Sequence, residues 1–354
     1  MKDPIALLPG LLAAYSPTGQ ETGAVDYLLE AMQVMGFEAH PDVVGNAVGS
    51  RGEGPNEILL LGHIDTVPGV IPVRWDGDRL YGRGAVDAKG PLACFVAAGA
   101  AANLMPGWRI TVIGAVGEEG DSRGARYLCE HYATPQMVVI GEPSGWDYIT
   151  LGYKGSFWCR YTVQKSLTHT AASQTGACEQ AVNFWNGVVQ AAACWNENKG
   201  RIFEHLTPTL RGMTSQQDGF VETAELRINI RLPLGITQHE LESHLTKLAG
   251  DGQIVVEDYI PAYKGEKNNA LVRGLLSGIR NVGGQPGFNI KTGTSDMNLV
   301  GPVWGCPIVA YGPGDSGLDH TPEEHILMSE YLAAVQILSH ALENVMQNEK
   351  ITSY

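Results

Sequence analysis

Residues 57–62 read EILLLG, an almost wholly apolar run that ends in glycine. Such a run is typical of a strand that is buried on both faces of a sheet. Residues 109–116 (RITVIGAV) and 137–141 (MVVIG) repeat the pattern. Residues 90–104, rich in alanine and leucine, and residues 122–131 have the composition of helices. Strands that alternate with helices predict an α/β fold, in which a mostly parallel sheet is covered by helices on both sides.

The pattern changes near residue 152. In residues 157–163 (FWCRYTV) and 224–231 (AELRINIR), polar and apolar side chains alternate, which is typical of sheets with one face in water. Two helical stretches, residues 177–196 and 238–248, separate these strands. This order predicts a smaller α+β domain that is inserted into the first domain.

The buried-strand pattern then returns in residues 307–311 (PIVAY), and a long helix is expected over residues 329–346. We therefore predict a discontinuous catalytic domain made of residues 1–152 and 266–354. Residues 153–265 are predicted to form the inserted second domain.

The composition excludes several classes of protein. Of the 354 residues, 44% are hydrophobic and 18% are charged, so the chain can bury two cores and is not disordered. Its 24 Lys+Arg residues face 38 Asp+Glu residues, which gives a formal net charge of −14. Such an excess of acid argues against a general nucleic-acid binder.

Other features of the sequence predict a cytoplasmic location. Six cysteines stand well apart without any C-x-x-C pair, as free thiols in a reducing compartment would. The apolar N-terminal run is split by Pro9 and Gly10 and lacks the pattern of a signal peptide. No apolar stretch approaches the roughly 20 residues that span a bilayer. We therefore expect no membrane partner.

Metal-binding side chains follow the predicted strands where each strand ends, and one more lies in a glycine-rich connection. In open α/β sheets, ligands bind at the carboxyl ends of the strands. Each residue alone has an ordinary explanation: an acidic pair is usually a solvated helix start, and Thr321-Pro322 could begin a helix. Together they indicate a binding site. The candidates are His63, Asp65, Asp87, Glu118, Glu119, Glu142, Asp319 and His320.

The residue types in this set indicate the metal. Imidazoles with carboxylates, and no thiolate at the strand ends, suit Zn²⁺, with Co²⁺ or Mn²⁺ as alternatives. The carboxylates are too many for one catalytic ion, so two ions about 3.5–4 Å apart that share a carboxylate are expected. Asp65 follows His63 at strand spacing, so it is better placed to orient the imidazole than to bind metal.

Five motifs in the chain resemble those of the M20 metallopeptidase/deacylase family. The motifs are residues 62–68 (GHIDTVP), 82–90 (GRGAVDAKG), 117–120 (GEEG), 141–144 (GEPS) and 311–322 (YGPGDSGLDHTP). They are highly specific and cover essentially the whole chain in order.

This resemblance implies two metal ions, a bridging carboxylate and a separate base. Glu118 would be the general base that activates water for attack on an amide. A cis peptide bond would follow the bridging residue, at Asp87–Ala88. The implied ligands are His63 and Glu142 for one ion, Glu119 and His320 for the other, and Asp87 for both.

The inserted segment resembles the lid of the same family, which commonly carries a homodimer interface. Residues 152–156 (GYKGS) match the start of the lid. His169, in residues 168–171 (THTA), falls where the family has a histidine that reaches the active site of the partner subunit and stabilises the oxyanion. The sequence differs here from the commoner His-Ser of the family. The alternative to this catalytic role is that His169 is an ordinary exposed histidine.

Residues 291–298 (KTGTSDMN) resemble the branch of the family that releases lysine or ornithine. The blocking group is then either acetyl or the terminal glutamate of an amino-group carrier protein used in lysine and arginine biosynthesis. Arg231, Lys291, Thr294 and Ser295 could bind a substrate carboxylate or serve as structural ion-pair and turn residues. Because the carrier is itself acidic, the acidic chain would need a basic rim. Deacetylation of acetyl-lysine or acetylornithine is the second hypothesis, and dipeptide hydrolysis the third.

Two other classes of protein are alternatives to a metal-dependent hydrolase: a serine hydrolase and a non-catalytic relative. Residues 314–317 (GDSG) resemble a serine-protease nucleophile, but the buried α/β pattern contradicts that fold. A non-catalytic relative would lose ligands, whereas this chain has all of them. No phosphate-binding loop or dinucleotide fingerprint indicates a nucleotide cofactor.

Overall fold

The computed structural model describes residues 4–169, 171 and 173–348, and the chain divides into two compact units. The first unit comprises residues 1–152, 265–290 and 295–354, and the second comprises residues 153–264 and 291–294. Each unit has its own hydrophobic core.

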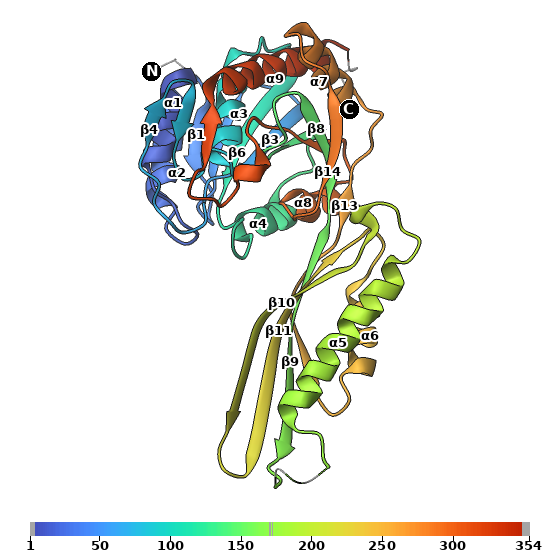
Figure 1. Ribbon diagram of the computed structural model, residues 1–354. Helices are drawn as coiled ribbons and strands as arrows, with labels where there is room; N and C mark the ends of the chain where they lie inside the picture. Colours follow the sequence, from blue (N-terminus) through green and yellow to red (C-terminus); the bar gives the residue numbers. More distant parts are fainter. Residues whose placement is uncertain (1–3, 170, 172, 349–354) are drawn as a thin grey trace. The chain divides into compact units, whose positions relative to one another are not determined.

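The first unit is built on a large sheet whose central strands are parallel (Figure 1). At its centre, β3 (Asn56–His63) lies between β6 (Trp108–Ala115) and β7 (Met137–Gly141), and β7 pairs with β15 (Ile308–Ala310). All residues of β3 and β7 are buried, which explains their continuous apolar sequence. The remaining strands of this unit's sheet are β1 (Glu38–Pro41), β2 (Ala47–Arg51), β8 (Tyr148–Tyr153) and β14 (Gly287–Lys291). Strand β13 (Tyr263–Lys264) falls within the residues of the second unit.

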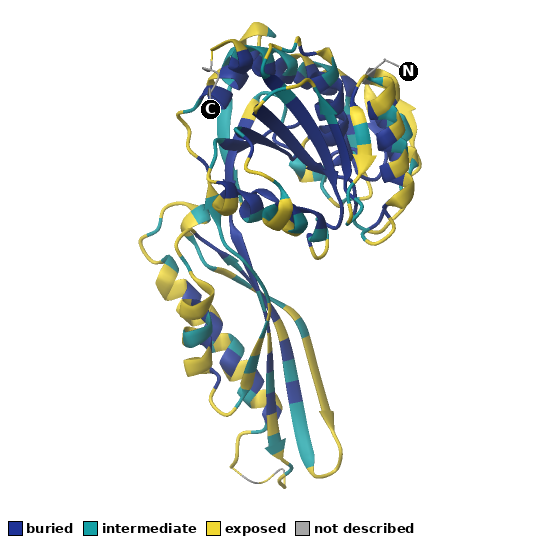
Figure 2. Cartoon of the chain, turned by 180° about the vertical axis from the view of Figure 1, so that it is seen from behind, coloured by how far each residue is buried: buried dark blue, intermediate teal, exposed yellow. Residues whose placement is uncertain are grey.

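Helices cover both faces of this sheet, as the alternation in the sequence predicts (Figure 1). One face carries α1 (Pro4–Ala13), α2 (Thr22–Val34), α3 (Lys89–Ala101), α7 (Ala270–Asn281) and α9 (Met328–Asn348). The other carries α4 (Arg123–His131), packed against α8 (Met297–Trp304). Figure 2 shows the strands between these two layers as the buried centre of the unit. The predicted α/β class is therefore confirmed.

A small antiparallel sheet accompanies the large one in the first unit. Its strands are β4 (Arg74–Asp76), β5 (Arg79–Tyr81) and β16 (His325–Leu327), with β5 in the middle. Strand β16 therefore joins a C-terminal segment to an N-terminal one. A 3₁₀ turn, η2 (Ser316–Leu318), precedes it.

The second unit is a four-stranded antiparallel sheet in the order β10-β11-β9-β12. Buried and more exposed residues alternate along its strands (Figure 2), because one face packs against two helices. In that core the rings of Tyr161 and Phe184 stack with their centroids 4.0 Å apart. The elements are β9 (Gly155–Ser166), α5 (Ala177–Asn196), η1 (Ile202–Glu204), β10 (Thr207–Gln217), β11 (Val221–Leu232), α6 (Gln238–Leu248) and β12 (Gln253–Ile260).

Among the described residues, no helix is both long enough and apolar enough to span a bilayer.

Candidate active site and metal centre

The parallel register of the central strands brings the predicted ligands to one edge of the sheet. His63 ends β3 and lies opposite Ala115 of β6, while Gly62 lies opposite Gly141 of β7. Glu118 and Glu142 come within three residues after the ends of those neighbouring strands. Parallel pairing therefore gathers three side chains that are far apart in the sequence.

His63 lies in the middle of this group, and its side chain is only 2% exposed. Its Nε2 atom is 3.1 Å from Oδ1 of Asp87 and 4.0 Å from a carboxylate oxygen of both Glu118 and Glu142. Burial opposes a charged imidazole, but hydrogen bonds to Asp65 and Asp87 outweigh it and raise the pKa of His63 well above its usual range.

His320 approaches the same carboxylate from the other side. Its Nε2 atom is 3.2 Å from Oδ2 of Asp87 and 2.8 Å from Oε1 of Glu119. Hydrogen bonds to these two carboxylates raise the pKa of His320 to about 10. One ligand atom from each of Asp87, Glu119 and His320 lies within 4.8 Å of the others. The two oxygens of Asp87 thus face two different imidazoles.

The chemistry of this donor set fits divalent cations. Burial raises the pKa of both Glu118 and Glu142 well above the usual range of a carboxyl group, and neighbouring acids add to the effect. A bound cation would remove this repulsion between buried carboxylates. Imidazole and carboxylate ligands suit Zn²⁺ and similar metals. The peptide bond Asp87–Ala88 is cis, as the resemblance implies.

Asp65 is fully buried and connects three segments of the site. Its Oδ1 accepts the backbone N–H of Glu118 at 3.0 Å, and its Oδ2 accepts that of Glu119 at 3.1 Å. Its backbone carbonyl lies 3.0 Å from Nδ1 of His63, closer than its carboxylate at 3.5 Å. The hydroxyl of Thr18 donates to Oδ2 at 2.7 Å. Asp65 therefore contacts the imidazole chiefly through its carbonyl, while its carboxylate holds the loop of the two glutamates.

The sequence alone does not reveal several residues that surround the site. Thr18, Arg83 and Glu324 contact the ligand-bearing loops, and Asp296 is buried close enough to add to the pKa shifts of Glu118 and Glu142. One carboxylate oxygen of Asp296 has no hydrogen-bond partner among the described residues, and burial raises the pKa of Asp296 to about 7. The only signal for them in the sequence is position: Arg83 and Asp296 lie within residues 82–90 and 291–298, and Glu324 follows residues 311–322.

The predicted carboxylate-binding residues do not all belong to one unit. In the second unit, Nη1 of Arg231 donates to Oγ1 of Thr294 at 3.1 Å, and the carbonyl of Lys291 accepts the backbone N–H of Lys154 at 3.1 Å. Ser295 belongs to the first unit, where it is 3% exposed and its hydroxyl accepts the backbone N–H of Met297 at 3.3 Å. Ser295 is therefore engaged at the start of α8.

His169 lies in the second unit and is exposed. Its Nδ1 accepts the backbone N–H of Ala171 at 3.1 Å. The intervening Thr170 of this predicted motif lies outside the described residues.

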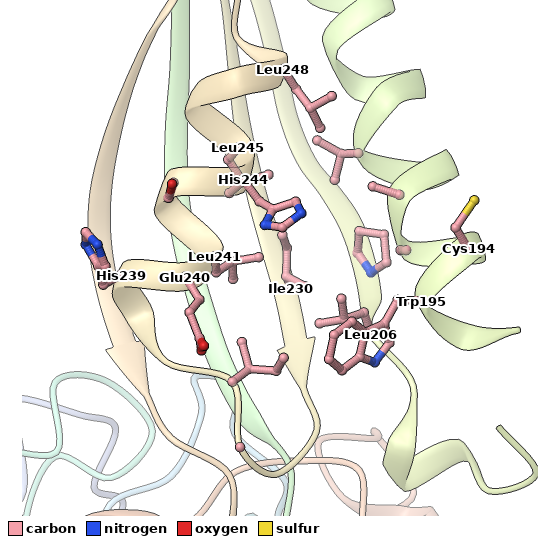
Figure 3. Close-up of a pocket in the computed structure, with 17 residues that line it drawn as sticks. Cys194, Trp195, Leu206, Ile230, His239, Glu240, Leu241, His244, Leu245 and Leu248 are labelled. Carbon is pink, nitrogen blue, oxygen red and sulfur yellow. The ribbon is translucent and has the colours of Figure 1, made fainter.

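A separate groove of about 870 Å³ runs between α5 and α6 of the second unit (Figure 3). Apolar side chains such as Trp195, Leu206 and Leu245 form most of its wall, and His244 is among its few polar residues. None of the predicted metal ligands lines it.

A mostly parallel α/β sheet with imidazoles and carboxylates at its carboxyl edge is typical of metal-dependent hydrolases. Residues 59–344 match the model of peptidase family M20/M25/M40, and the chain belongs to this family. The chain is 43% identical over 340 residues to the [LysW]-lysine hydrolase of Deinococcus radiodurans, and the aligned residues make up 94% of each protein. It is 39% identical over 345 residues to a putative [LysW]-lysine/[LysW]-ornithine hydrolase of Thermococcus kodakarensis, covering 97% of this chain and 92% of that protein.

Solved structures share the fold at low sequence identity. The M20 metallo-carboxypeptidase Sso-CP2 of Sulfolobus solfataricus has a TM-score of 0.80 and 18% identity, over 98% of this chain and 100% of the other. The YXEP protein of Bacillus subtilis, described as a dinuclear metal-binding peptidase of family M20, has a TM-score of 0.74 and 12% identity, over 98% of both chains.

Proposed function

We propose that this chain is a dinuclear metal-dependent amide hydrolase, which releases lysine or ornithine from the terminal glutamate of an amino-group carrier protein. The names of the relatives from Deinococcus radiodurans and Thermococcus kodakarensis support this substrate class over free acetyl-amino acids or dipeptides. The proposal places the enzyme in the cytoplasm, where such a biosynthetic carrier would be loaded and unloaded.

The observation that carries the proposal is the position of Asp87 between two imidazoles. Its Oδ1 lies 3.1 Å from Nε2 of His63 and its Oδ2 lies 3.2 Å from Nε2 of His320. A carboxylate with one oxygen toward each of two ligand groups is suited to two ions that share it. His63 and Glu142 would hold one ion, and Glu119 and His320 the other. Zn²⁺ is our first choice, and Co²⁺ or Mn²⁺ would suit the same donors.

Bound divalent ions would lower the pKa of water and polarise the amide carbonyl. Glu118 would accept the proton from the attacking water at a carboxylate oxygen and return it to the nitrogen of the departing amine. Burial already raises the pKa of Glu118, which suits a group that must both take and give a proton near neutral pH. Asp65 would keep the Glu118 loop in place through its 3.0 Å contact to the backbone N–H.

The second unit would contribute substrate recognition and the interface of a homodimer. Arg231, supported by Thr294, and Lys291 would bind the carboxylate of the lysine or ornithine. In the dimer, each His169 would enter the partner's site and donate a hydrogen bond to the oxyanion.

The distribution of charge between the units removes one objection to an acidic carrier as the partner. The second unit contains 11 Lys and Arg residues and 11 Asp and Glu residues. The whole formal net charge of −14 therefore falls on the first unit. Because the second unit has no net negative charge, a carrier that docks there avoids the general repulsion expected from the composition.

Release of amino acid by the Zn²⁺-loaded enzyme tests the proposal. The substrates are a carrier domain with lysine or ornithine on its terminal glutamate, N-acetyl-lysine, N-acetylornithine and a lysine dipeptide. We expect fast release from the carrier and little from the small compounds, and no release by Glu118→Gln. Fast turnover of the acetyl compounds without turnover of the carrier would contradict the proposed substrate.

A further inference from the structure

Two loops that lie far apart in the sequence carry Asp87 and His320 to the candidate metal centre. The first loop follows β5, and the second precedes β16. These strands pair in antiparallel fashion, with His325 opposite Tyr81. Both loops therefore start from the same end of the small sheet.

Glu324 belongs to the second loop, directly before β16, and its side chain is only 1% exposed. Its Oε1 accepts the backbone N–H groups of Val86 at 2.9 Å and Asp87 at 3.1 Å. Its Oε2 accepts Nη1 of Arg83 at 2.8 Å. Glu324 thus holds the backbone of the residue whose carboxylate faces both imidazoles, without touching that carboxylate.

Arg83 completes the connection from the other side and is 8% exposed. Its Nη1 also donates to the carbonyl of Thr321 at 3.3 Å, and its Nε donates to the carbonyl of Gly69 at 3.0 Å. Thr321 directly follows His320, whose backbone is in the left-handed region with φ of 61°. Arg83 thus fixes the chain at the point where His320 leaves it.

We propose that Arg83 and Glu324 are positioning residues, which together set the separation between Asp87 and His320. A buried ion pair by itself contributes little or nothing to stability, because desolvation offsets the attraction. Beyond the ion pair, Glu324 accepts backbone N–H groups of the first loop, and Arg83 donates to a backbone carbonyl of the second loop. Its role is therefore to fix the geometry of the position formed by Asp87, Glu119 and His320. The inference rests on the proposed metal ligands.

Metal titration of two variants tests this role. Arg83→Lys keeps the positive charge, but one ammonium cannot reach Glu324, Thr321 and Gly69 with the geometry of the guanidinium. Glu324→Gln keeps one acceptor oxygen and turns an amide N–H₂ toward Arg83. Changes to groups that orient metal ligands typically weaken metal binding about 10–100-fold.

Glu57→Gln is the matched control. Glu57 is also a buried glutamate paired with an arginine, since its Oε1 accepts Nε of Arg109 at 3.1 Å. It also accepts the hydroxyl groups of Thr111 at 2.5 Å and Tyr132 at 2.9 Å. It lies near the start of β3, at the end opposite His63.

Calorimetric titration of the metal-free proteins with Zn²⁺, together with thermal unfolding, separates the outcomes. We expect two ions in the natural protein and in Glu57→Gln. In Arg83→Lys and Glu324→Gln, one ion should bind about 10–100-fold more weakly. Unchanged binding of both ions in these two variants, with only a lower melting temperature, would overturn the positioning role. Failure of the natural protein to bind two ions would overturn the proposed function, and the positioning role with it.

Discussion

Oδ1 of Asp65 accepts the backbone N–H of Glu118 at 3.0 Å, so the residue that contacts the His63 imidazole also fixes the predicted base. The neighbouring N–H of Glu119 is bound by the other oxygen at 3.1 Å. The carboxylate of Asp65 therefore links the loop that follows β6 to the end of β3. Through this connection Asp65 would support the proposed metal site without being a ligand itself.

We expect Asp65→Asn to lower kcat by roughly 10–100-fold, because its amide N–H₂ would face a backbone N–H group and displace the glutamate loop. Steady-state kinetics with the loaded carrier would measure the loss. Thr18→Val is the matched control, since it removes only the 2.7 Å hydrogen bond to Oδ2 and should cost less. Equal losses in the two variants would show that the contact to the Glu118 loop is not the important one.

Glu118→Gln should lower kcat by roughly 10²–10⁴-fold, because glutamine cannot accept the proton of the attacking water. Metal content should stay at the level of the natural protein, since Glu118 is not among the proposed ligands. Atomic emission after dialysis, measured beside kcat, tests both statements. Loss of metal in this variant would make Glu118 a ligand rather than a base.

Asp87→Ala should reduce the bound metal from two ions to at most one. Within the part of the chain that the structure describes, Asp87 is the only residue whose carboxylate lies within 3.2 Å of both His63 and His320. In the natural protein, added Zn²⁺ should raise the melting temperature, because a ligand that binds only the folded state stabilises it. We expect this increase to shrink or vanish in Asp87→Ala. Two ions with natural affinity in the variant would refute a bridging role.

The strands and ligands that the sequence predicts share a local signature. Residues 58–62 and 137–141 are apolar throughout, and each run leads directly into a predicted ligand, His63 or Glu142. The parallel register then follows from the alternation of strands and helices. The clustering of His63, Glu118 and Glu142 could therefore be expected from the sequence alone.

The supporting residues carry no such signature. Glu324 is an ordinary glutamate in a polar loop, and its burial depends on the pairing of β16 with β5, which are three residues long each. Strands this short give no periodic pattern.

The boundary between the units has no signature in the sequence either. Nothing in the composition of residues 291–294 separates them from Ser295, although they fall into different units.

The second unit also permits a prediction about pH and stability. Lys154 is only 1% exposed, and its Nζ donates to the carbonyls of His205 at 2.5 Å and Ile202 at 3.3 Å, and to the hydroxyl of Thr207 at 3.0 Å. Burial, with a further contribution from Arg231, lowers the pKa of Lys154 to about 8 from the usual 10.5. Between these values the unfolded chain binds more protons than the folded chain at this residue, so stability rises with pH.

We therefore expect the free energy of unfolding of the natural protein, minus that of Lys154→Met, to increase from about pH 8 to pH 10. The slope should be at most about 1.4 kcal/mol per pH unit, since one proton is involved. Denaturant titrations at several pH values would measure it. Lys247→Met changes an exposed lysine of α6 and is the control for the loss of one lysine side chain. A difference for Lys154→Met that does not change with pH would mean that the ammonium keeps its ordinary pKa, and that its three oxygen acceptors offset the cost of burial.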